Sequence, residues 1–114
     1  MKSIYAYLAT FEILDTYWKE TKIDGLRSVL SAMNPNPLYE TPYLSADPGV
    51  FADWSAEWDK VVGAGREGDA VQVFNIAKSV LDYYTVELGY DLGEADNYLE
   101  AKLTSLPKTL ALAG

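Results

Sequence analysis

The chain has neither cysteine nor histidine among its 114 residues. The absence of cysteine rules out disulfide bonds and fits a reducing compartment. No basic stretch followed by an apolar run marks the N-terminus as a signal peptide, so we expect a cytoplasmic protein. The absence of histidine excludes Ser-His-Asp and Cys-His nucleophilic sites and every histidine-ligated metal site. Any catalysis would therefore depend on carboxylates, lysine, tyrosine or arginine, and the sequence predicts no cofactor.

Long apolar runs and positive charge are also scarce. No run of about 18 apolar residues is long enough to cross a membrane. The net charge is −8, from 17 acidic and 9 basic residues. Such a chain repels nucleic acids and anionic lipids and attracts basic proteins, so we expect neither nucleic acid nor membrane as a partner. Apolar residues make up 49 % of the chain, enough for one hydrophobic core, and residues 1–114 are expected to form a single domain.

Apolar residues recur at intervals of three and four, which is typical of helices with one buried face. In the first helix this spacing places Ile4, Tyr7 and Leu14 inward, and in the fourth it places Tyr84 and Leu88 inward. No run of alternating β-branched residues predicts a strand. The predicted fold is all-α, a compact bundle of about five helices over approximate residues 3–21, 24–33, 48–62, 69–88 and 94–106.

Two segments are predicted to lie outside the helices. Residues 34–46 contain three prolines and form a long loop, since the residue before a proline is driven out of the helical region. Asp47 and Asp69 follow as predicted N-caps of the next two helices. The tail 107–114 begins with a proline and is expected to be frayed or loosely docked.

A shift of 67 residues aligns the first helix with the fourth. Residues 13–24 and 80–91 then share five identical positions and one conservative exchange, Ile13 with Val80. In both segments a long helix ends, a turn follows and a second helix begins. The bundle is therefore predicted to consist of two duplicated helical hairpins.

The stretch from Asp82 to Glu100 holds six carboxylates and four tyrosines but no lysine or arginine. Tyrosine offers a large, stiff contact surface, and carboxylates attract the arginine and lysine side chains of a partner. We therefore predict a binding surface for a basic protein here, with two loop tyrosines added. Its predicted residues are Asp82, Tyr83, Glu87, Tyr90, Asp91, Glu94, Tyr39 and Tyr43.

Paired carboxylates leave an enzymatic alternative open. Glu12 and Asp15 are three residues apart on one helix, and Asp91 and Glu94 have the same spacing. Such pairs can hold Mg²⁺ between helices, as in all-α nucleotide pyrophosphohydrolases. This alternative is a metal-dependent hydrolase, and it requires the four carboxylates to converge. A third alternative is a homodimeric scaffold protein.

Two segments carry a resemblance to a known group of proteins. Asp24-Gly-Leu-Arg-Ser-Val-Leu-Ser-Ala-Met33 is an acidic start followed by a leucine-rich short helix, and Ser45-Ala-Asp-Pro48 leads to Asp53-Trp54. Together they resemble small bacterial immunity proteins of contact-dependent growth inhibition, which neutralise a cognate toxin. The resemblance covers about residues 10–60 and carries over no binding residue. It implies a non-enzymatic inhibitor that occludes a basic toxin domain.

Overall fold

The computed structural model describes residues 1–35 and 45–106. Over these residues it is all-helical and contains no strand, only an isolated bridge between Pro35 and Ser45. This confirms the predicted all-α bundle of about five helices. The elements are α1 (Ser3–Thr21), α2 (Asp24–Met33), α3 (Pro48–Val61), α4 (Ala70–Asp82), the π-helix η1 (Tyr83–Glu87) and α5 (Ala95–Thr104). None of the described helices has the length and apolar character needed to cross a membrane.

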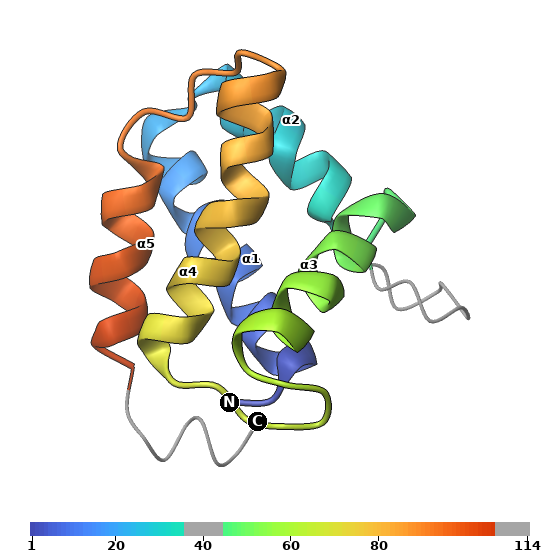
Figure 1. Cartoon of the computed structure of the whole chain (residues 1–114). Coiled ribbons are helices and arrows are strands. Elements are labelled where there is room, and N and C mark those ends of the chain that lie inside the picture. Colours follow the sequence, from blue (N-terminus) through green and yellow to red (C-terminus); the bar gives the residue numbers. More distant parts are fainter. Residues whose placement is uncertain (36–44, 107–114) are drawn as a thin grey trace.

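Helix α4 lies between α3 and α5 and packs against both, with α1 behind it (Figure 1). Helix α1 also contacts α2, α3 and α5. Its buried residues are Ala6, Tyr7, Thr10, Leu14 and Tyr17. The inward position predicted for Ile4 is wrong: its side chain is 50 % exposed, because it lines an open surface hollow and not the core.

Local signals in the sequence set where α3 and α4 begin. Asp47 accepts a hydrogen bond from the backbone of Gly49 at 3.0 Å, and Pro48 occupies the first helical position. Asp69 and Gln72 form a reciprocal capping box at the start of α4, with bonds of 2.9 and 3.0 Å. Each of these bonds satisfies a backbone donor that the first helical turn leaves unpaired.

The centre of the core is aromatic. Trp54 of α3 is fully buried, and its ring meets Tyr7 edge to face at 5.4 Å. Tyr7 is also fully buried, and its hydroxyl donates to the backbone carbonyl of Met33 at the end of α2. One side chain of α1 thus joins α2 and α3.

Two close backbone contacts tie distant segments together. Gly25, at the start of α2, lies directly against the backbone of Asp91 in the turn before α5. Nearby, the backbone N–H of Glu94 donates to the hydroxyl of Tyr17 at 3.0 Å. Asp24 and Asp91, the last aligned pair of the predicted duplication, are therefore on neighbouring segments. The duplication itself stays a prediction.

Candidate functional site

The end of α4 departs from regular helix. The sequence predicts an α-helix through Leu88, but the α-helix ends at Asp82 and five residues, Tyr83–Glu87, form a π-helix. The backbone N–H of Leu88 closes it on the Tyr83 carbonyl at 3.3 Å. The inward position predicted for Leu88 is therefore wrong, because the widened turn changes the helical register, and its side chain is 46 % exposed. π-Helical turns occur frequently at functional sites.

Three tyrosine rings gather around this turn. Tyr84 is buried, with 8 % of its surface exposed. Its ring stacks on Tyr90 at 6.1 Å and meets Tyr83 edge to face at 5.5 Å. Tyr83 and Tyr90 themselves are 51 % and 38 % exposed. We call the exposed side chains of this segment the tyrosine face: Tyr83, Val86, Leu88 and Tyr90.

A groove runs beside Tyr83, between α3 and α4. It consists of two hollows of about 140 and 180 Å³ that share Asp53, Val80 and Tyr83 as lining residues. Three carboxylates line it from α3 and its cap: Asp47, Asp53 and Glu57. Among the residues that the structure describes, no lysine or arginine lines either hollow. We call this feature the α3–α4 groove.

The three carboxylates differ in how far their charge is compensated. Glu57 forms an ion pair with Lys60 at 3.2 Å, and Asp47 accepts the capping bond from Gly49. Asp53 takes part in none of the ion pairs formed within residues 1–35 and 45–106.

Burial raises the pKa of the Tyr84 phenol, and the negative charge of Asp47 raises it further. The phenol therefore stays neutral at physiological pH and remains able to accept a hydrogen bond from a cation.

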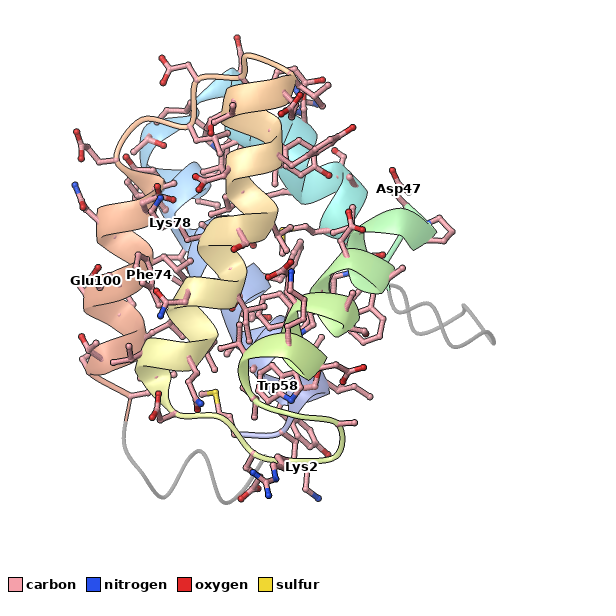
Figure 2. The ribbon with its side chains drawn as sticks, in the orientation of Figure 1. Lys2, Asp47, Trp58, Phe74, Lys78 and Glu100 are labelled. Carbon is pink, nitrogen blue, oxygen red and sulfur yellow. The ribbon has the colours of Figure 1, made fainter. Side chains whose placement is uncertain are left out.

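The residues predicted as a binding surface lie on two sides of this region. Tyr83 and Glu87 are exposed on the π-helical turn, and Tyr90 is exposed just after it. Asp82 instead pairs with Lys78 at 3.2 Å, and Figure 2 shows Lys78 on the side of α4 that faces α5. Partial burial raises the pKa of Asp96 on α5, while the positive charge of Lys78 lowers this pKa and the negative charge of Asp82 raises it.

The remaining predicted residues are at the α4–α5 turn or outside the described chain. Asp91 is exposed and accepts a hydrogen bond from the backbone of Gly93 at 2.8 Å. Glu94 is also exposed and accepts one from the Asn97 side chain. Tyr39 and Tyr43 lie outside the described residues.

Sequence reasoning missed the α3 carboxylates. Asp53 and Glu57 are four residues apart, so they lie on one helical face, and this spacing was the available signal. It also missed Val86, which is 75 % exposed, because an α-helical pattern gives no sign of a π-helical turn.

The carboxylates of the hydrolase alternative do not form a metal site. Across residues 1–35 and 45–106, no group of three or more acidic side chains is arranged to hold a metal ion. Glu12, Asp15, Asp91 and Glu94 all belong to these residues, so the convergence that this alternative requires is not found. Asp15 instead pairs with Lys19 at 3.0 Å.

A larger hollow of about 470 Å³ lies at the other end of α3. Figure 2 shows Lys2 and Trp58 at this end of the helix and Asp47 at the opposite one. Two cations, Lys2 and Arg66, and two anions line the hollow, so its charges balance.

Comparisons of the chain with protein-family models, with curated proteins and with solved structures found no match.

Proposed function

We propose that this chain is a non-enzymatic binding module that holds a basic protein on its tyrosine face and α3–α4 groove. One observation carries the proposal: exposed tyrosines adjoin a carboxylate-lined groove, and no lysine or arginine of residues 1–35 and 45–106 lines that groove. Large exposed apolar groups on a soluble protein mark interaction surfaces when they gather in one place.

The two parts of the surface supply different terms of the binding free energy. Tyr83 and Tyr90 offer large rings whose burial favours association, and tyrosine is among the residues that dominate interfaces energetically. The carboxylates of the groove and Glu87 attract a positively charged partner over several ångströms and raise the association rate. The net charge of −8 acts in the same direction.

The charge also bears on the homodimer alternative. Two copies that met through this face would bring carboxylates of like sign together, which costs free energy. The surface therefore favours a different, basic protein over a second copy. Light scattering during size exclusion measures this directly, and we expect a monomer at low micromolar concentration.

The resemblance over residues 10–60 suggests the class of partner. Immunity-type proteins neutralise a toxin, and a basic catalytic cleft has the charge that this surface attracts. We propose that the chain acts as such an inhibitor, by covering the cleft and excluding its substrate. This step rests on the sequence resemblance and on charge complementarity.

The test begins with capture of basic proteins from a cell extract on the immobilised chain at low salt, followed by purification of the captured partner. Calorimetric titration then compares wild type with Tyr83→Ala and Glu87→Lys. We expect each variant to weaken binding by about tenfold or more. Truncation of a tyrosine that is a binding hot spot costs about 2 kcal/mol or more, and Glu87→Lys replaces an attraction to the basic partner by a repulsion. Binding should also weaken as salt is raised.

Two exposed positions elsewhere provide matched controls. Val71→Ala shortens a side chain that is 61 % exposed at the start of α4, and Glu100→Lys reverses a charge on α5, labelled in Figure 2. Both should leave the affinity unchanged. If Tyr83→Ala and Glu87→Lys bind as tightly as these controls, the tyrosine face is not the binding surface.

A further inference from the structure

A hollow between α1 and α2 shares no lining residue with the α3–α4 groove. Its volume is about 310 Å³, at the lower end of the roughly 300–1,000 Å³ that small-molecule sites span. We call it the α1–α2 hollow, and its lining includes Phe11, Asp15 and Trp18 of α1 and Arg27, Leu30 and Ser31 of α2. The hollow is therefore large enough for a small molecule, and Phe11, Trp18 and Leu30 give it apolar walls.

Trp18 brings to this hollow a buried donor without a partner. Its indole nitrogen Nε1 is buried, and within residues 1–35 and 45–106 it is the only buried side-chain nitrogen or oxygen that makes no hydrogen bond. The other two indoles are paired, since Trp54 donates to the Ser3 hydroxyl at 3.2 Å and Trp58 donates to the Arg66 carbonyl at 3.1 Å. A buried N–H normally has a partner, and an indole N–H can only donate. The missing partner is therefore a hydrogen-bond acceptor.

Positive charge gathers around the α1–α2 hollow, although the whole chain carries a net charge of −8. Asp15 is the only carboxylate among the described residues that line the hollow, and Lys19 pairs with it at 3.0 Å. The Lys22 ammonium lies 4.2 Å from the centre of the Trp18 ring. Arg27 lines the hollow and takes part in none of the ion pairs within the described residues. The acceptor that suits this hollow is therefore an anion.

We propose that the α1–α2 hollow binds a small organic carboxylate with an apolar body. The carboxylate accepts hydrogen bonds from the Trp18 indole N–H and from the Arg27 guanidinium, and the apolar body lies against Phe11 and Leu30. Arg27 is exposed, so its side chain can move aside and let the carboxylate reach the covered indole nitrogen. Inorganic phosphate or sulfate fits less well, because neither has an apolar part to contact these walls. This site and the proposed protein-binding surface do not depend on each other.

The indole N–H itself reports binding. In the ¹⁵N-labelled protein each tryptophan gives one side-chain N–H signal, and Trp18→Phe identifies the Trp18 signal by its loss. Phenylacetate is the probe, phenylacetamide is its neutral counterpart of nearly the same shape, and acetate lacks the apolar body. We expect phenylacetate at millimolar concentration to move the Trp18 signal downfield, because a hydrogen bond forms. The signals of Trp54 and Trp58 should stay in place, because both indoles are already paired.

The two comparison probes separate charge from apolar contact. Phenylacetamide should bind about tenfold more weakly than phenylacetate, because it offers no charged acceptor to Arg27. Acetate should also bind about tenfold more weakly, because it buries no ring against Phe11 and Leu30.

Two arginine variants with the same change of charge locate the site. Arg27→Gln removes the guanidinium from the hollow, and we expect about tenfold weaker phenylacetate binding because a charged hydrogen-bond donor is lost. Arg66→Gln is the matched control, because it changes the net charge equally at a residue outside the hollow, and it should bind like wild type. Both arginines are exposed, so both variants should fold.

Several results would overturn the carboxylate site. The Trp18 signal may not be moved by phenylacetate only if the site is absent, and a Trp18 signal already downfield in the free protein would mean that the indole has a partner. Equal binding of phenylacetamide or acetate would remove the carboxylate or the apolar body from the proposal. Equal losses in Arg27→Gln and Arg66→Gln would reduce the effect to overall charge. None of these results bears on the tyrosine face, which Tyr83→Ala tests separately.

Discussion

Replacing Gly25 with alanine has two opposing effects on the free energy of unfolding, and the typical size of each is known. Gly25 is the second residue of α2, and alanine is favoured over glycine within helices by about 1 kcal/mol. The added methyl group would, however, overlap the carbonyl of Asp91 and lie 3.1 Å from its carbonyl carbon and its backbone nitrogen. These are backbone atoms, so no side-chain rotation relieves the overlap.

The net change in stability is the difference between the helical gain from alanine and the cost of the overlap with Asp91. Overpacking of a tight contact costs typically about 1–3 kcal/mol, and here the chain must shift because the obstacle is backbone. After the helical gain is subtracted, we expect Gly25→Ala to lower the free energy of unfolding by about 1 kcal/mol. For a domain of this size that corresponds to a melting temperature lower by roughly 4 °C. The turn before α5 should also move, because Asp91 is the group that is displaced.

Gly49→Ala is the matched control. Gly49 is likewise the second residue of its helix, α3, but an added methyl group would meet only the Asp47 carboxylate oxygen, at 3.3 Å. This neighbour belongs to a side chain and can move, so we expect unchanged or slightly higher stability. Urea denaturation followed by circular dichroism measures both variants. If Gly25→Ala stabilises the protein as much as Gly49→Ala does, the reasoning about the α2–Asp91 contact is wrong.

Two further predictions concern buried polar groups. Tyr7→Phe removes the hydroxyl that donates to the buried Met33 carbonyl, and it should destabilise the protein by about 1–3 kcal/mol in urea denaturation, whereas Tyr5→Phe at an exposed position should have no effect. Partial burial raises the pKa of Asp96 above its ordinary 3.8, so the folded state binds this proton more tightly than the unfolded state does, and the stability contributed by Asp96 falls as pH rises above that value. Asp96→Asn should therefore match wild type near pH 3 and be more stable at pH 7; a variant less stable than wild type at pH 7 would contradict the sign of this shift.

The sequence predicted the helices well because their signals are local. Asp69 caps α4 as expected, and Asp47 with Pro48 starts α3 as expected. Asp24 shows the limit of such signals: aspartate is a favoured N-cap residue, but Asp24 is the first residue of α2 and its side chain makes no capping bond. A residue of capping type locates a helix start to within a position or so, and packing decides the rest.

The candidate site was predicted only in part, for a physical reason. Tyr83, Glu87 and Tyr90 are close in sequence, so a local pattern could find them. The α3–α4 groove joins Asp53 to Tyr83, thirty residues apart, and this proximity follows from how α3 crosses α4. No periodicity within one helix contains that information. The side chain of Asp82 points away from that of Tyr83, because the side chains of consecutive helical residues point about 100° apart around the helix axis.

The π-helical turn lets the residues before it stay packed in the core while the residues after it point in a direction that a regular α-helix would not give them. One extra residue in an α-helix rotates everything after it by about 100° around the axis. Here that rotation about the helix axis occurs within Tyr83–Glu87, and Val80 and Leu81 before the turn remain in the core. We therefore expect deletion of a single residue from this segment to leave the bundle intact and to change the direction in which the exposed aromatic rings point. Natural relatives with that deletion would be expected to share the scaffold and to recognise something else.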